Sequence, residues 1–501
     1  MMKRIIDNRK SFYSLIEAGL IVMFAAELIF LATFRSIWFD EAFSLAIVRH
    51  SVQDIISLTA ADVHPPLYYF ILKIAFSLFG ESICVAKLVS VLPSVLTLIF
   101  STCFLKKHFS DKAAILFLLC FIASNNMVYY SIEIRMYSWA LFFVTMTAIA
   151  VWHIISDGKT IWWIMFLLSA VCAAYTHYYA GLTVGIEYIL LLYYIIRHDR
   201  KKVFHVFSVA ILALLLYLPW IATVISQFAD VSENFWEGPL SIRKILFTFF
   251  RIFSVGSFLE QNSLTVKITT RLFSLLFCTV FLFYFFRKNK DHRDFFAFSG
   301  LSSMMMTAFI GISLSFIIHP MFIFRYLVPA SGLVWFFVAI EGSYIKSKKF
   351  VTVFCFVLLS FGVITYTTVL FSKQKSNDDF NTLHSFFSSK IKPDDVFEYD
   401  GQKRNFNAFL ISYLFTEHPV IEGTLETFHY QLVYNKVFKI KYVSNSLLSD
   451  SCKQKNVRIL KFIREPYENA LKDDDIEFCG SFKYESEVGI VKYNVFAKSI
   501  K

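Results

Sequence analysis

The sequence contains few charged residues for its length. Asp, Glu, Lys and Arg make up 17% of the 501 residues, whereas hydrophobic residues make up 56%. An ordinary soluble domain has roughly 25% charged residues, so a soluble protein of this size is excluded. Apolar runs long enough to cross about 30 Å of hydrocarbon lie at 12–34, 82–105, 113–131, 138–155, 161–179, 181–196, 203–226, 271–286, 295–318, 324–342 and 349–371. They predict a polytopic α-helical membrane protein with about eleven transmembrane helices.

Several common motifs are also missing. The sequence has no Gly-rich loop that would hold a nucleotide cofactor, no Cys or His spacing typical of a zinc or haem site, and no internal repeat. Six of the eight cysteines lie in or beside apolar runs, where Cys behaves as a small hydrophobe. Only Cys452 and Cys479 are placed where a disulfide could form in an oxidising compartment. The sequence does not decide whether these two cysteines are bonded or reduced.

Basic residues are concentrated in alternate loops, and positive charge is retained on the cytoplasmic side of a membrane. The basic positions are Lys3, Arg4, Arg9, Lys10, Lys106, Lys107, Lys112, Arg197, Arg200, Lys201, Lys202, Arg287, Lys288, Lys290, Arg293, Lys346, Lys348 and Lys349. This pattern predicts a cytoplasmic N-terminus, with the loops that contain 35–66, 132–137, 227–270 and 319–323 outside. The loop 156–160 contributes least to this orientation, since Lys159 is its only basic residue.

The composition changes after residue 372. Short alternating runs at 396–399, 457–460 and 488–491 are typical of strands, and 378–389 is typical of a helix. We therefore expect a transmembrane domain over 1–372 and an extracytoplasmic α/β domain over 373–501. The second segment has 19 basic and 18 acidic residues, so nearly all of the net charge of +11 belongs to the membrane part. The basic balance reflects topology and does not predict nucleic-acid binding.

An acidic pair, Asp40 and Glu41, follows the first apolar run. A carboxylate at a membrane surface must be hydrated, paired or used. One interpretation is that the two acids cap a surface helix over 42–48, where backbone N–H groups are free. The other is that one of them is a general base. The pair alone does not decide between them.

Polar and aromatic residues gather at other predicted outer ends of spans. They are His64, Tyr68, Tyr69, Glu133, Arg135, Tyr137, His177, Tyr178, Tyr179, Arg325 and Tyr326. Singly, the arginines could extend to lipid headgroups and the tyrosines could belong to an aromatic belt. Together they suit transfer from a lipid-linked phosphosugar, because Arg and His offset charge on a departing phosphate and Tyr can line a sugar subsite.

The stretches WFDEAFSL, ADVHPPLYY, SIEIRMYSWAL and YTHYYAGL resemble the polytopic glycosyltransferases of the GT-C fold, in the bacterial ArnT-like and protein-mannosyltransferase-like (glycosyltransferase family 39-like) group. The resemblance covers roughly 12–345. It implies a polyprenyl-phosphate sugar donor, an acceptor that is a lipid, glycan or protein, and inverting transfer at the outer face of the bacterial inner membrane.

The resemblance also implies roles for particular residues. Asp40 matches the catalytic acid, Glu41 completes its pair, Glu133 and Arg135 match the second-loop motif, and His64 matches the first-loop His-Pro-Pro. Some relatives bring a divalent cation to the phosphate, and the possible ligands here are Asp40, His64, Glu133 and His177. The segment 373–501 departs from the relatives and is a candidate for acceptor selection.

Three other functions agree less well with the sequence. A transporter or flippase of lipid-linked sugars would show Gly- or Pro-broken spans in two related halves, and with ten Pro and no half-to-half similarity this pattern is missing. A polysaccharide polymerase or ligase would carry its Arg and His residues in a large late external loop, whereas here they are densest in the first two. Eleven spans are more than an anchor for a receptor domain requires.

Overall fold

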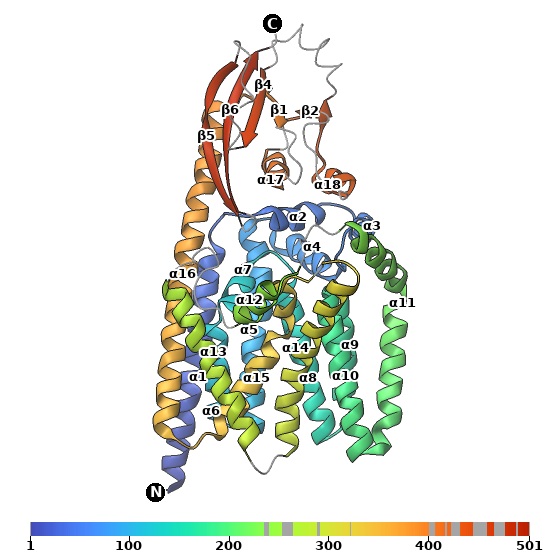
Figure 1. Ribbon diagram of the computed structural model, residues 1–501, viewed down its shortest axis with the longest axis vertical. Coiled ribbons are helices and arrows are strands. Elements are labelled where there is room, and N and C mark those ends of the chain that lie inside the picture. The colour runs from blue at the N-terminus through green and yellow to red at the C-terminus, as the bar shows by residue number, and fades with distance from the viewer. Residues whose placement is uncertain are drawn as a thin grey trace. The chain divides into compact units, whose positions relative to one another are not determined.

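The computed structural model describes residues 2–234, 240–252, 264–287, 291–320, 322–399, 406–415, 418–421, 431–443, 458–464, 476–486 and 489–499 (Figure 1). The chain forms two compact units. The first combines residues 1–33 with 63–370, and the second combines 34–62 with 371–501. The predicted first external loop is therefore assigned mostly to the same unit as the C-terminal segment.

All regular secondary structure in the described part of the first unit is helical. Its helices are α1 (Met2–Ala32), α4 (Leu67–Phe79), α5 (Ile83–His108), α6 (Asp111–Ala123), α7 (Asn125–Ile132), α8 (Tyr137–Ser156), α9 (Thr160–Thr176), α10 (Tyr178–His198), α11 (Val203–Asn234), α12 (Ile242–Ile252), α13 (Leu264–Phe286), α14 (His292–Ile317), α15 (Val328–Tyr344) and the first part of α16 (Lys348–Lys390), with short 3₁₀ turns η1 (Arg200–Lys202) and η3 (Phe324–Leu327). Within the described ranges, nine helices are long and apolar enough to cross a membrane.

Each of the eleven apolar runs coincides with helix, but two do not form one long span. The run 113–131 is broken at Ser124 into α6 and α7, which are bent by 68°. Counting this pair as one span raises the number of candidates from nine to ten. The run 161–179 ends at Thr176, so α9 has only 17 residues. The short apolar helix α4 was not predicted.

The centre of the bundle is formed by α15 and its neighbours. Every residue from Val328 to Gly342 is buried, as expected for a helix that is apolar on all sides. In contrast, α11 has many large exposed apolar side chains, among them Ile211, Leu215 and Leu218. An apolar surface of this kind suits a helix that faces lipid, so the predicted multi-pass membrane protein is confirmed.

Several of the basic residues that predict the orientation have structural partners, among them Lys106, which pairs with Glu17, and Arg287. Arg287, which follows α13, forms an ion pair with Asp294 on α14 and another, at 3.1 Å, with Glu341 on α15. Its guanidinium group also lies 4.3 Å from the ring centroid of Tyr344. Both acids are buried, so the loss of Arg287 would leave two uncompensated carboxylates and strongly destabilise this end of the bundle.

The second unit contains a mixed sheet. Its strands are β1 (Val396–Tyr399), β2 (Val420–Ile421), β3 (Tyr442–Val443), β4 (Arg458–Arg464), β5 (Ile476–Ser486) and β6 (Gly489–Ser499), in the order β3-β2-β1-β4-β6-β5. The first four positions in this order pair in parallel, and β6 pairs antiparallel to both β4 and β5. The predicted α/β class is confirmed, and 378–389 is the end of α16.

Helices complete this unit: α2 (Phe39–Ile47), α3 (Val52–Ala61), α17 (Phe406–Leu414) and α18 (Gln431–Phe438). A partly buried ion pair links two neighbouring strands, since the Arg458 guanidinium group on β4 lies 2.6 Å from a carboxylate oxygen of Asp395, just before β1. Cys452 lies outside the described residues, so whether it pairs with Cys479 stays open.

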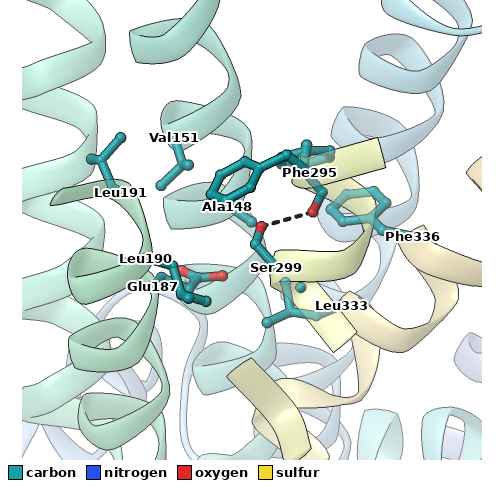
Figure 2. A pocket seen from close by; sticks show the side chains of 11 residues that line it. Ala148, Val151, Glu187, Leu190, Leu191, Phe295, Ser299, Leu333 and Phe336 are labelled. Carbon is teal, nitrogen blue, oxygen red and sulfur yellow. Dashed lines mark hydrogen bonds between the residues drawn. The ribbon is translucent and has the colours of Figure 1, made fainter. Parts of the chain in front are cut away.

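A small pocket inside the first unit holds a buried acid (Figure 2). Glu187 on α10 is 5% exposed, and within the described part of the chain its Oε2 atom has no hydrogen-bond partner. The pocket has a volume of about 10 Å³, room for one water molecule at most. Ser299 lies across it and donates its hydroxyl proton to the Phe296 carbonyl oxygen at 2.8 Å.

We expect Glu187→Met to stabilise the protein. An unsatisfied buried polar group costs about 1–3 kcal/mol, and Met replaces the carboxyl group with an apolar one of similar length. Thermal unfolding in detergent should show the gain, with the exposed Glu81→Met as the control. A loss of stability for Glu187→Met would instead reveal a water molecule or another partner in the pocket.

Candidate active site

The acidic pair lies at the start of α2, in the second unit. Glu41 is 1% exposed, and its Oε2 atom accepts a hydrogen bond from the Trp38 backbone N–H at 3.1 Å. This is the reach-back contact of a capping box. Asp40 is less deeply buried, and its backbone carbonyl accepts a bond from the Ser44 hydroxyl at 3.0 Å. The capping interpretation therefore applies to Glu41, and the catalytic role of the pair stays a prediction.

In the first unit, Arg135 is the centre of a buried polar group. Its guanidinium nitrogens lie 3.1 Å from His64 Nε2 and 3.4 Å from the Tyr69 hydroxyl. Arg135 is 3% exposed and His64 is 9% exposed. Pro65 keeps His64 out of a helical conformation, so α4 begins only at Leu67 and carries Tyr68 and Tyr69 in its first turn.

The turn after α7 places Arg135. The Arg135 backbone N–H donates to the Glu133 carbonyl oxygen at 2.7 Å, which closes a three-residue turn before α8 begins at Tyr137. Glu133 and Tyr137 are both fully buried. The two predicted second-loop motif residues therefore lie on either side of one tight turn, and Tyr137 starts the next helix.

His177 gathers the aromatic members of the site. It lies in the break between α9 and α10, with its ring centroid 6.4 Å from that of His64, 5.6 Å from Tyr137 and 5.3 Å from Tyr326. Tyr179 also joins this group, since its ring lies 4.9 Å from that of Tyr326. Gly311 makes room for it, because a Cβ atom there would lie 2.7 Å from the Tyr179 ring.

The protonation state of His177 follows from its surroundings. Its Nδ1 atom accepts a hydrogen bond from the Tyr179 backbone N–H at 3.2 Å, which places the proton of a neutral ring on Nε2. Burial lowers the pKa of His177 well below its usual value, and the positive charges of His64, Arg135 and Arg325 lower this pKa further. His177 is thus a neutral donor near two arginines.

A cavity of about 670 Å³ extends from this polar group. His64, His177 and Tyr326 line one part of it. The remaining lining is almost entirely apolar, from α9, α10 and α11, and includes Phe166, Leu182, Val184, Val209, Ala213 and Leu214. Its polar end is lined by two histidines and a tyrosine, and the Arg135 guanidinium group lies just behind it, 3.1 Å from His64. A cavity with long apolar walls and hydrogen-bond donors at one end suits an amphipathic anion.

Tyr178 belongs to the cavity but faces α11 and not the arginines. Its hydroxyl group donates to the Gln227 side chain and accepts from Trp220 Nε1, the latter at 3.1 Å. Gln227 also lines the cavity and was missed from the sequence. A buried amide in an otherwise apolar helix is the signal that could have found it.

The last of the predicted site residues is Arg325. Arg325 lies in the 3₁₀ turn η3 beside Tyr326, and its charge acts on His177.

Over the described ranges, no three His, Cys, Asp or Glu side chains come together as metal ligands. His64 Nε2 faces the guanidinium group of Arg135, which does not suit a cation ligand. Within the described part of the first unit, His64, Glu133 and His177 do not form a set of metal ligands.

The comparison with solved structures decides the fold. The crystal structure of ArnT from Cupriavidus metallidurans bound to undecaprenyl phosphate matches with a TM-score of 0.58 and 11% identity, over 95% of this chain and 97% of that one. Its apo state matches with a TM-score of 0.57 and 10% identity, over 95% and 98%. This chain has the ArnT fold. The comparison with curated protein sequences gives no match.

A family model agrees with the ArnT fold. Residues 63–226 match the model described as dolichyl-phosphate-mannose-protein mannosyltransferase. The matched stretch includes the His-Pro-Pro motif, the turn with Glu133 and Arg135, and the α9–α10 break. The resemblance predicted from the motifs is confirmed, for the fold over nearly the whole chain and for the family model over this stretch.

The lowered pKa of His177 gives a pH prediction. Since the unfolded state binds a proton near pH 6.5 and the folded state does not, stability is complete above this pH and falls as the pH decreases below it. The slope is at most about 1.4 kcal/mol per pH unit for one group. We expect His177→Gln to reduce this loss between about pH 6.5 and 5, measured by denaturant unfolding. A constant difference from wild type at every pH would contradict this assignment.

Proposed function

We propose that this protein transfers a sugar from a polyprenyl-phosphate donor to an acceptor hydroxyl group at the outer face of a bacterial inner membrane. The observation that carries the proposal is the cavity that joins apolar walls on α9, α10 and α11 to an end lined by His64, His177 and Tyr326, beside the Arg135 guanidinium group that contacts His64. A polyprenyl-phosphate sugar has the same division into a long apolar tail, a phosphate and a polar ring. The ArnT structure with bound undecaprenyl phosphate supports this choice of donor.

The length of the apolar wall suits a prenyl tail. Cavity-lining residues on α11 run from Val209 to Phe228, which is roughly 28 Å at 1.5 Å per residue. This is close to the ~30 Å thickness of the hydrocarbon core. Gly185 on α10 leaves the wall open, since a Cβ atom there would meet nothing within 4 Å.

The end of the cavity at His64 and His177 suits a phosphate group. An Arg side chain binds phosphate through a planar fork of N–H donors, and Arg135 and Arg325 supply two such groups. His177 adds a neutral Nε2–H donor. As the bond between the anomeric carbon and the phosphate oxygen breaks, negative charge grows on that oxygen, and these donors stabilise it without rearrangement.

The acceptor needs a base, and we assign this role to Asp40. Its carboxylate takes the proton from the acceptor hydroxyl while the hydroxyl oxygen bonds to the anomeric carbon and polyprenyl phosphate departs. A single displacement of this kind inverts the anomeric configuration. Glu41 holds the first turn of α2 through the Trp38 N–H.

The direct test is to incubate purified protein in nanodiscs with polyprenyl-phosphate sugars, both hexosyl and pentosyl, and to measure released polyprenyl phosphate. A transporter of such lipids would move them without cleavage. Release of polyprenyl phosphate therefore supports transfer, and movement of intact donor across the bilayer without any cleavage contradicts it.

Asp40→Asn should lower turnover by about 10²–10⁴-fold, the usual contribution of a positioned base. Asn keeps the shape of the side chain and can still occupy a helix start, so expression and donor binding should remain. Glu41→Gln should cost less, because Gln also completes a capping box. Near-normal turnover in Asp40→Asn, beside an inactive Glu41→Gln, would move the base to Glu41.

A second variant tests the apolar wall. Gly185→Phe fills the cavity beside α10, and the displacement of two CH₂ groups of a prenyl tail costs about 0.8 kcal/mol each, which is roughly tenfold in affinity. Donors with a full-length tail should bind correspondingly weaker, while short-tailed donors bind as in wild type. Gly19→Phe on the exposed face of α1 is the matched control. Equal affinity of Gly185→Phe for the long donor would remove this wall from the donor site.

A further inference from the structure

The helix that carries the acidic pair is packed onto the C-terminal segment by aromatic side chains. Phe39 on α2 lies 6.4 Å from Phe409 on α17, and 5.3 Å and 5.7 Å from Tyr434 and Phe438 on α18, between ring centroids. Phe43, one turn along α2, lies 5.9 Å from Tyr434 and 6.2 Å from Phe438. We call these five rings the aromatic clamp. All five are less than one-tenth exposed.

Polar contacts fasten the same loop on either side of α2. The Arg35 backbone N–H donates to the Asn377 side-chain oxygen at 2.8 Å. Beyond α2, the Arg49 guanidinium group lies 5.0 Å from the ring centroid of Tyr413. A ring nitrogen of His50 lies 3.1 Å from the Val437 carbonyl oxygen. The loop is therefore held before, along and after α2.

A helix as short as α2 depends on such packing. It has nine residues, whereas isolated helices shorter than about 12–15 residues are marginal in water. Phe39 and Phe43 lie four residues apart and so on one face, which is the face that the clamp covers. Asp40 follows Phe39 directly, so the packing of the Phe39 ring sets the direction of the Asp40 carboxylate.

We propose that the C-terminal segment is a positioning device for the catalytic carboxylate: the aromatic clamp and its flanking contacts fold α2 and fix the direction of Asp40. This inference rests on the proposed role of Asp40 as general base. Phe39, Phe43, Phe409, Tyr434 and Phe438 are positioning residues in this account. They act through Asp40 and have no contact with donor or acceptor assigned to them.

The test compares two substitutions of buried aromatic residues in full-length protein. Phe438→Leu loosens the clamp, and Phe462→Leu, in β4, removes a ring that packs on Phe397 and Tyr399 in the sheet. We expect kcat to fall at least about tenfold in Phe438→Leu, because small misplacements of a catalytic group are costly, with the donor KM unchanged. Phe462→Leu should keep the wild-type kcat per folded molecule. Equal loss of kcat in both variants would mean that the aromatic clamp contributes only to stability and does not position Asp40.

Two further variants separate this inference from the proposed function. Tyr434→Phe keeps the ring and should keep kcat, as a conservative rescue of the position. In an Asp40→Asn background, Phe438→Leu should slow the reaction no further, because both changes act through one carboxylate. If Asp40→Asn is inactive while Phe438→Leu turns over like wild type, the clamp is refuted and the base stands. If Asp40→Asn is active, Asp40 is not the general base, and both that assignment and the inference that rests on it are refuted.

Discussion

The burial of the Arg135 guanidinium group is the constraint on which the first unit depends. A charged group inside a membrane protein needs partners at fixed distances, and here His64 and Tyr69 come from a segment about 70 residues away in sequence. The two prolines before α4, the turn at Glu133 and the break at His177 each interrupt an apolar helix. Each interruption puts a polar side chain where an unbroken span would have only apolar ones.

Much of the fold could be predicted because the apolar runs and the strand runs are local patterns. The number of spans was less predictable, since Ser124 starts a new helix with a 68° bend inside one apolar run. Ser124-Asn125-Asn126 is a helix-start signal that the length of the run obscured. The short helix α4 was missed because its 13 residues are too few for a span.

The polar part of the candidate site could also be predicted, because Arg, His and Tyr are conspicuous in an apolar chain. The direction of a side chain could not. Tyr178 and Tyr179 are neighbours, yet the first contacts Gln227 on α11 and the second contacts Tyr326. Pairing between distant aromatic residues, such as Phe39 with Tyr434, follows no sequence rule, because Phe and Tyr occur throughout the chain.

The attachment of α11 makes the bilayer a component of the site. The hydrogen bonds between this helix and its neighbours include those from Tyr175 to the Leu216 carbonyl and from Tyr188 to the Val206 carbonyl. Most of its remaining surface is apolar and exposed. Lateral pressure from the surrounding lipid therefore acts directly on one wall of the cavity. The capacity of the cavity becomes a property of the protein and its solvent together, and it differs between a micelle and a bilayer.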